Sequence, residues 1–222
     1  MNIKTKDLYD LTHTKASEYL QQFEYPWQAL AGISEFVEAY GKSLPQDEYD
    51  MIAENVWIAK DAVIYNKMSN YFKGPCVIGH RTEIRPGAFI RGSVLVGDDC
   101  VVGNSTELKN VILFDNVQVP HYNYVGDSIL GYKAHMGAGS ITSNVKSDKK
   151  NVVIHNNGEE HETGRKKIGG LIGDNVEVGC GSIINPGTIV GRGSNIYPLS
   201  SVRGCVPENS IYKDKGDIVA KK

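Results

Sequence analysis

The sequence lacks most of the features that mark metal-binding, disulfide-stabilised, membrane-spanning or nucleic-acid-binding proteins. Its four cysteines lie far apart without a CxxC pair, which argues against a zinc knuckle or a disulfide framework. No stretch reaches the roughly 18 apolar residues that a membrane-spanning helix needs, and the first residues do not form a signal peptide. Lys and Arg number 24 against 26 Asp and Glu, so no global basic field points to nucleic acid. We therefore expect a soluble, cytoplasmic protein whose partners are neither nucleic acid nor membrane.

Glycine is abundant instead, at 24 of 222 residues against a usual share of about 7%. An aliphatic residue returns at every sixth position from residue 172 onward, and the same frame fits earlier segments after one-residue deletions. We call each such position a rung. The predicted rungs are Ile52, Ile58, Ile64, Ile78, Ile84, Ile90, Val96, Val102, Leu108, Leu113, Val119, Val125, Leu130, Met136, Thr142, Ile172, Val178, Ile184, Val190, Ile196 and Val202.

A period of six fits neither the 3.6-residue repeat of a helix nor the two-residue alternation of a simple strand, but it fits short strands joined by tight turns in a parallel β-helix. The aliphatic residue points inward, and a small residue four positions later fits the corner. Three rungs for each triangular coil give about seven coils, on the order of 30 Å tall at the usual strand spacing. We expect this all-β domain to span residues 49–210, with a short tail at 211–222.

Residues 1–48 lie outside the repeat and read as a short α-helical extension. Pro26 suits the first turn of a helix, and an apolar stripe from Trp27 to Val37 has helical spacing. Gly41 suits the end of that helix. Because the open first coil exposes a sheet edge, we expect the helices to cover it. A helix pair that binds a partner is the alternative.

Residues 143–170 interrupt the repeat and form an inserted arm. The turn signal Asn156-Asn157-Gly158 lies between the apolar run 152–154 and a polar run, which predicts extended chain with a tight turn. A loop of this length is seldom without a role in a compact fold.

Stacking the rungs on paper brings a set of polar and small residues into one column. His121, Ala138, Cys180 and Pro198 each lie two residues past a rung of the same face, and Arg85 lies on that face two coils below His121. An imidazole near its ordinary pKa suits proton removal from an amine. Arg and Lys suit a phosphate anchor. The column is therefore a candidate site, although an exposed His or Arg on a β-helix is more often only a surface residue.

Several sequence blocks carry a family resemblance. "IRPGAFI", "ELKN", "PHYNYVGDS", "GAGSITSN" and "TGRKKIGGLIGDNVEVG" resemble the acetyltransferase half of the bifunctional sugar-1-phosphate nucleotidyltransferase/acetyltransferases, over about residues 75–205. The resemblance implies a left-handed β-helix, a homotrimer with sites between subunits, and acetyl-CoA as cosubstrate, with no metal required. It also implies N-acetylation of an amino-sugar 1-phosphate of the glucosamine type, a step that supplies sugar nucleotides for the cell envelope.

The resemblance also assigns roles to particular positions. It makes His121 the general base and places Tyr124 and Asn144 against the sugar phosphate. Arg85 and Lys109 would bind the phosphate, and either Lys150 or Lys167 would supply a further cation. The acetyl-CoA contacts would fall at Ala138, Cys180 and Pro198, which the column had already selected.

Two departures from the family pattern stand out. His135 occupies a position where the family often has Asn, and the first 50 residues contain no glycine-rich phosphate loop after a strand, so we expect no nucleotidyl transfer. A non-catalytic trimeric module that senses a sugar nucleotide, or that serves a separate nucleotidyltransferase as a scaffold, is the alternative function. A metal-dependent hydratase of the γ-carbonic anhydrase kind is disfavoured, because His80, His121 and His135 do not reproduce its close pair of histidines.

Overall fold

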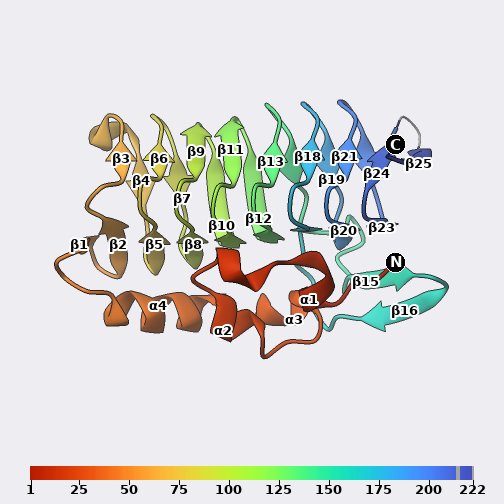
Figure 1. Ribbon diagram of the computed structural model, residues 1–222, viewed down its shortest axis with the longest axis horizontal. Coiled ribbons are helices and arrows are strands. Elements are labelled where there is room, and N and C mark those ends of the chain that lie inside the picture. The colour runs from red at the N-terminus through yellow and green to blue at the C-terminus, as the bar shows by residue number, and fades with distance from the viewer. Residues whose placement is uncertain (214–215, 222) are drawn as a thin grey trace.

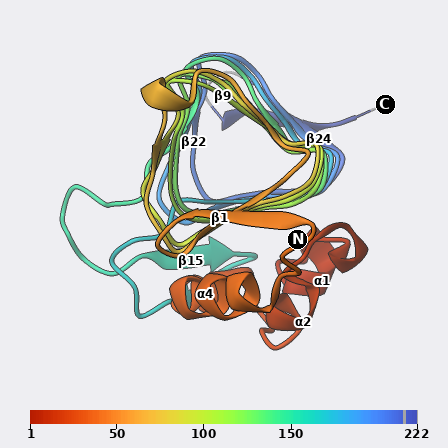
Figure 2. The same ribbon diagram turned by 90° about the vertical axis from the view of Figure 1, so that its left-hand side faces the viewer.

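The chain winds into a three-sided coil of parallel β-strands, with helices lying along one side (Figures 1 and 2). The computed structural model describes residues 1–213 and 216–221. Each turn of the coil visits three faces in the same order, and the strands of successive turns pair in register. The end-on view shows the triangular outline that results (Figure 2).

We name the faces first, second and third in the order in which the chain visits them. The first face stacks β2 (Val56–Ala59), β5 (Cys76–Ile78), β8 (Val94–Val96), the second halves of β10 (Glu107–Leu113) and β12 (Tyr124–Leu130), β17 (Gly170–Ile172), β20 (Thr188–Val190) and β23 (Cys205–Val206). The second face stacks β3 (Val63–Ile64), β6 (Glu83–Ile84), β9 (Val101–Asn104), β11 (Gln118–His121), β13 (His135–Met136), β18 (Glu177–Val178), β21 (Asn195–Ile196) and β24 (Ser210–Tyr212). The third face stacks β4 (Tyr71–Phe72), β7 (Phe89–Ile90), the first halves of β10 and β12, β14 (Ile141–Thr142), β19 (Ile183–Ile184) and β22 (Ser201–Val202).

The predicted rungs form the core of the coil. All of them except Ile52 and Ile64 are buried, and Ile64 is half-buried on the second face. Full burial of one aliphatic side chain contributes roughly 1.5–3 kcal/mol. The hydrophobic repeat therefore accounts for both the parallel pairing and the stability of the stack.

We expected about seven turns. The coil has one more, since the first face stacks eight parallel strands. Phe72, Val206 and Tyr212 are further rung positions. Phe72 follows Ile64 by eight residues and Val206 follows Val202 by four, so both lie outside the six-residue period, and Tyr212 then follows Val206 by six. Ile52 is not a rung. It is 51% exposed in β1 (Tyr49–Ala53), which pairs antiparallel with β2.

An antiparallel strand adjoins the stack at each end. β1 pairs with β2 at the N-terminal end, and β25 (Ile218–Ala220) pairs with β24 at the other. An exposed sheet edge invites pairing with another chain, and a paired strand removes that liability. The expectation that the helices cover the open edge of the first coil was wrong, because β1 occupies that edge.

The N-terminal helices lie along the first face instead (Figure 1). They are α1 (Thr5–Leu8), the 3-10 turn η1 (Leu11–His13), α2 (Ser17–Leu20), α3 (Pro26–Ala29) and α4 (Ile33–Ser43), and a further 3-10 turn, η2 (Lys67–Ser69), lies in the coil. α4 contacts β5, β8 and β10. None of the helices in the described ranges has the length and apolarity to cross a bilayer.

The predicted helix differs in detail from the one observed. Pro26 is the first residue of α3, as expected, but the helix breaks after Ala29 and restarts at Ile33. Gly41 lies inside α4 rather than after it. A Cβ at Gly41 would come within 2.1 Å of the Trp57 ring, so this glycine allows α4 to pack closely on the first face.

The inserted arm forms an antiparallel hairpin of β15 (Val153–Asn156) and β16 (Glu159–Glu162). Asn157 and Gly158 at its turn both have positive φ, at 53° and 81°, which is the geometry of a tight type I′ hairpin turn. Val152, Ile154 and Ile168 are buried within the hydrophobic core. The arm is therefore packed against the rest of the molecule.

Candidate functional site

A column of exposed residues follows the corner between the second and third faces. The N–H of Gly139 donates to the carbonyl of His121 (2.9 Å), that of Gly181 to Ala138 (2.8 Å) and that of Leu199 to Cys180 (2.9 Å). His121, Ala138, Cys180 and Pro198 therefore occupy successive levels of one corner, as the repeat predicted, with His121 directly below Ala138. All four are exposed.

Two backbone N–H groups of this column remain open. In residues 1–213 and 216–221, the N–H groups of Ala138 and Cys180 donate to no protein acceptor. Both lie beside exposed small side chains, where a ligand that follows the column could reach them. Such groups suit an amide-rich ligand or a developing oxyanion.

Asn123 braces the corner from inside and was not singled out in the sequence. Its side-chain oxygen accepts from the N–H of His121 (3.0 Å), while its Nδ2 donates to the carbonyls of Gly137 (2.9 Å) and Ser140 (3.0 Å). The residue is buried. It therefore fixes the backbone that carries His121 to the level that carries Ala138, and the signal for it was its place in the "HYNY" motif.

Three other predicted residues meet on the third face around a carboxylate. Lys109 Nζ lies 3.0 Å from Asp127 Oδ1, and Asn144 Nδ2 donates to Asp127 Oδ2 and to the hydroxyl of Tyr124 (3.1 Å). Asp127 is only 2% exposed. Burial raises the pKa of the Tyr124 phenol, and the Asp127 charge raises it further. A lysine held by a buried carboxylate has a fixed position, which suits it to bind an anion.

Asp127 was missed because sequence reasoning favoured cations and His for this chemistry. Its signal was its place in the quoted block "PHYNYVGDS". Its backbone adopts φ 48°, at the corner where β12 bends from the third face to the first. The carboxylate therefore faces Lys109, Asn110 and Asn144 at once.

Arg85 is not part of this cluster in the single chain. Its N–H pairs with the carbonyl of Val102, which places it on the second face two levels below His121, about 10 Å away at the usual strand spacing. Its guanidinium donates to the Glu83 carboxylate at 2.8 Å. The structure confirms the predicted level of Arg85 and gives it a carboxylate partner two residues earlier, in β6.

The two competing lysines of the arm lie in different places. Lys167 forms a bridge with Val145 and lines a hollow with Lys109 and Asp127. Lys150 lies in an exposed turn, where its N–H donates to the Asp148 carboxylate (3.0 Å). Lys167 therefore lines the same hollow as Lys109, and Lys150 does not.

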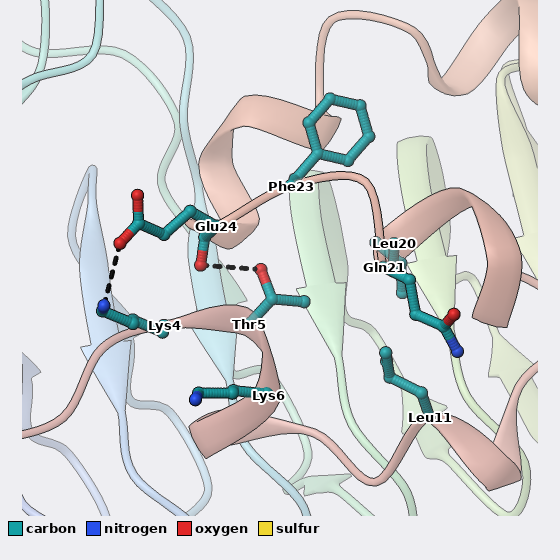
Figure 3. A pocket seen from close by; sticks show the side chains of 8 residues that line it. All are labelled: Lys4, Thr5, Lys6, Leu11, Leu20, Gln21, Phe23 and Glu24. Atoms are coloured by element: carbon teal, nitrogen blue, oxygen red, sulfur yellow. Dashed lines mark hydrogen bonds and ion pairs between the residues drawn. The ribbon is translucent and has the colours of Figure 1, made fainter.

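Another hollow lies away from both groups, within the N-terminal segment (Figure 3). An ion pair between Lys4 and Glu24 (2.9 Å) spans it, and apolar side chains including Leu20 and Phe23 line its wall. None of the predicted site residues lines it. In the described ranges, no group of three or more His, Cys, Asp or Glu side chains gathers as a metal site would require.

The comparisons with known proteins agree with this fold. Residues 72–159 match the family described as the GMPPB C-terminal domain. Among solved structures, the polySia-specific acetyltransferase NeuO superposes with a TM-score of 0.50 at 15% identity, covering 72% of this chain and 80% of that chain. This likeness concerns the fold alone. The class that the fold defines is the left-handed β-helix of hexapeptide-repeat proteins.

Sequence relatives narrow the class. The chain is 32% identical over 206 residues to the bifunctional protein GlmU of Methanococcus maripaludis, an alignment that covers 92% of this chain and 49% of the relative. It is 33% identical over 188 residues to a bifunctional sugar-1-phosphate nucleotidylyltransferase/acetyltransferase of Sulfurisphaera tokodaii, covering 74% and 47%. The chain is similar to a part of these bifunctional proteins, and it spans about half the length of the curated relatives it matches.

Proposed function

We propose that the chain transfers an acetyl group from acetyl-CoA to the amine of an amino-sugar 1-phosphate of the glucosamine type. The observation that carries this proposal is the stacking of His121 directly below Ala138 on an exposed corner. A proton acceptor and an open backbone N–H then lie on adjacent levels, where an amine and a thioester could meet. The product would supply an N-acetyl sugar phosphate for sugar-nucleotide synthesis.

The proposed chemistry begins with His121. Its imidazole takes a proton from the sugar amine while the amine nitrogen attacks the thioester carbonyl carbon. The N–H of Ala138 would donate to the oxyanion of the tetrahedral intermediate. The carbon–sulfur bond then breaks, and the departing thiolate of coenzyme A receives the proton from the imidazolium.

The sugar phosphate would be held by the cations and polar groups of the third face. Lys109, fixed by Asp127, and Lys167 supply positive charge, while Tyr124 and Asn144 offer a hydroxyl and an amide. Arg85 would provide a further phosphate contact. Fixing the phosphate orients the amine toward the thioester, and such proximity can contribute several kcal/mol to the lowering of the barrier.

We further propose that the site is completed between copies in a homotrimer. The His121 column follows the corner between the second and third faces, whereas Lys109 and Asn144 lie toward the corner between the third face and the first. The width of the third face therefore separates the two groups within one chain. The column of one copy facing the Lys109 cluster of a neighbour would bring base and phosphate anchor together.

An acetyl-transfer assay tests the proposal. Glucosamine 1-phosphate and acetyl-CoA are incubated with the protein, and free coenzyme A and N-acetylated product are both measured. We expect His121→Ala to lower turnover by roughly 10²- to 10⁴-fold, since a general base contributes that much. His155→Ala, which removes an exposed imidazole on the arm hairpin, is the matched control and should leave turnover unchanged. Undiminished turnover in His121→Ala would remove His121 as the base, and absence of coenzyme A binding would favour the scaffold alternative.

A further inference from the structure

The hollow that contains Lys109 and Lys167 has walls from three distant parts of the chain. The coil contributes Lys109, Asn110 and Asp127, the inserted arm contributes residues 164–167, and the N-terminal segment contributes Leu30 with its neighbour Ala31. The volume of this hollow is about 440 Å³. We name it the cationic pocket. The coil alone does not form this pocket, because part of the pocket wall comes from the N-terminal segment.

One backbone atom of the N-terminal segment joins the other two walls. The carbonyl oxygen of Leu30 accepts from Asn110 Nδ2 of the coil (3.2 Å) and from Arg165 Nη2 of the arm (3.4 Å). Asn110 also donates to Asp127 Oδ1 (2.9 Å), the same oxygen that faces Lys109. The Leu30 carbonyl therefore sets where the arm's guanidinium lies relative to the lysine of the coil.

Further contacts fasten the hairpin of the arm to the N-terminal segment. The His161 ring lies 5.3 Å from the Tyr25 ring and 5.9 Å from the Trp27 ring, and Tyr25 and Trp27 stack on each other at 4.5 Å. At the hairpin turn, the amino group of Met1 donates to Asn156 Oδ1 (3.2 Å), and Asn156 Nδ2 donates to the carbonyl of Met1 (3.0 Å). The arm is thus held at its turn, along β16 and at Arg165.

The N-terminal segment is itself fixed to the coil. The N–H of Asp115 donates to the carbonyl of His13 (3.0 Å), and the N–H of Asp174 donates to the carbonyl of Leu8 (3.1 Å). Lys15 pairs with Asp98 at 2.9 Å. These contacts follow the corner between the first and second faces over several turns, so the segment has a defined position from which to hold the arm.

The charges of the cationic pocket favour an anion. Among the described residues that line the pocket, Asp127 is the acidic one, and its carboxylate is already paired with Lys109. In the described residues, no carboxylate lies within ion-pair distance of Arg165, Lys166 or Lys167. Their positive charges are therefore not neutralised by a carboxylate, and the guanidinium N–H groups that do not face the Leu30 carbonyl can donate to a phosphate.

We propose that the N-terminal segment is a positioning element of the phosphate subsite: it holds the arm so that Arg165, a further phosphate-binding residue, faces Lys109 across the cationic pocket. The proposal rests on the function proposed above and deepens it, since it names the residues that set acceptor affinity. Tyr25 and Trp27 do not line the pocket and act through Arg165 and the arm, and the Leu30 carbonyl acts by holding the Arg165 guanidinium.

Two variants with one matched control test the proposal in the full chain. His161→Ala removes the contact with Tyr25 and Trp27, and Arg165→Ala removes the guanidinium. His155→Ala is the control, because it lies on the same hairpin but its ring, 65% exposed, faces Glu160 rather than the N-terminal segment. Apparent KM for glucosamine 1-phosphate, apparent KM for acetyl-CoA and kcat are measured for each, together with the calorimetric affinity for N-acetylglucosamine 1-phosphate.

We expect KM for the sugar phosphate to rise about three- to ten-fold in His161→Ala, the size expected for one aromatic contact. In Arg165→Ala the rise should be about ten-fold or more, as for loss of a charged hydrogen bond. KM for acetyl-CoA should stay unchanged, His155→Ala should match the unaltered protein, and Arg165→Lys should recover part of the affinity. A general folding defect would instead affect both KM values and the unfolding midpoint.

The outcomes separate this proposal from the proposed function. If the unaltered protein acetylates no amino-sugar phosphate, the function fails, yet calorimetry with N-acetylglucosamine 1-phosphate still tests the pocket. Unchanged sugar-phosphate affinity in both His161→Ala and Arg165→Ala would overturn the positioning role, as would absence of sugar-phosphate binding to the unaltered protein. Weakened affinity in these two variants, with unchanged affinity in His155→Ala, would support it.

Discussion

The His121 column and the Lys109 cluster occupy the same coil but are built in different ways. The column comes from consecutive turns whose backbones hydrogen-bond level to level, so its geometry follows from the repeat. The Lys109 cluster, which comprises Lys109, Tyr124, Asp127 and Asn144, depends on the buried Asp127 carboxylate. The wall of the cationic pocket also includes the arm and the N-terminal segment. The repeat therefore places the proposed base, while long-range packing places the proposed phosphate anchors.

Removing the Lys109 side chain should have the largest effect on the Lys109 cluster. In Lys109→Ala we expect KM for the sugar phosphate to rise about 10- to 100-fold, as for loss of a charged hydrogen bond. The unfolding midpoint should also fall, because Asp127 is left buried without its cation. Steady-state kinetics and thermal unfolding measure the two effects.

A double variant separates binding from stability. Lys109→Ala with Asp127→Asn should recover much of the unfolding midpoint while KM stays high, since the buried charge is gone but the cation is still missing. Lys42→Ala on the exposed surface of α4 serves as a control for loss of one lysine. An unaltered KM in Lys109→Ala would show that the phosphate binds elsewhere.

Two glycines of the GAG motif offer a matched test of the column. A Cβ at Gly137 would lie 2.7 Å from the backbone nitrogen of Cys180 on the next level, whereas a Cβ at Gly139 would meet nothing within 4 Å. We expect Gly137→Ala to lower the free energy of unfolding by about 2–3 kcal/mol, the cost of forcing packed backbones apart. Gly139→Ala should cost about 1–2 kcal/mol, because its φ of 69° strains a residue with a Cβ. Urea unfolding of both proteins measures the difference, and equal losses would contradict the close stacking of the column.

The smallest expected effect concerns the thiols. At pH 8 an alkylating reagent should modify Cys180, which is exposed in the column, while Cys76 and Cys100 stay unmodified because burial excludes the reagent and raises their pKa. Burial raises the pKa of Cys205 to about 11, which should also slow its reaction. Mass spectrometry identifies the modified residue, with Cys180→Ser as the control.

Acetyl-CoA should slow the modification of Cys180 if it lies along the column as proposed. The rate is compared with and without the cosubstrate. Glucosamine 1-phosphate alone should have no such effect, because its proposed subsite involves the third face. Protection by the sugar phosphate rather than by acetyl-CoA would indicate that the sugar phosphate, and not acetyl-CoA, lies along the column.

Much of the fold could be predicted because hydrophobic periodicity is a local property. Rungs such as Ile84, Val102 and Met136 repeat at intervals that no helix or flat sheet explains, and their stacking gave the order of the column. Register errors would turn an inward side chain outward, so the buried repeat also fixed which residues the corner displays. The hairpin of the arm was readable for a similar reason, since its turn requires residues that tolerate positive φ.

The position of the N-terminal helices could not be predicted in the same way. The apolar stripe that includes Ile33 and Val37 indicates which side of α4 is buried, but not what buries it. The expected place over the first coil was wrong because β1 already pairs with that edge. Gly41 was interpreted as a helix end, yet its value lies in the close approach to Trp57.

The sequence by itself determined the three-sided coil, the level of each rung and the stacking of His121 below Ala138, because each depends on spacing along the chain. The tertiary structure alone decided that Asp127 holds Lys109, that Lys167 rather than Lys150 lines the pocket, and that Leu30 joins the arm to the coil. These contacts link residues separated by up to 135 positions. They follow from how surfaces pack in three dimensions, and the hydrophobic period along the chain carries no information about that packing.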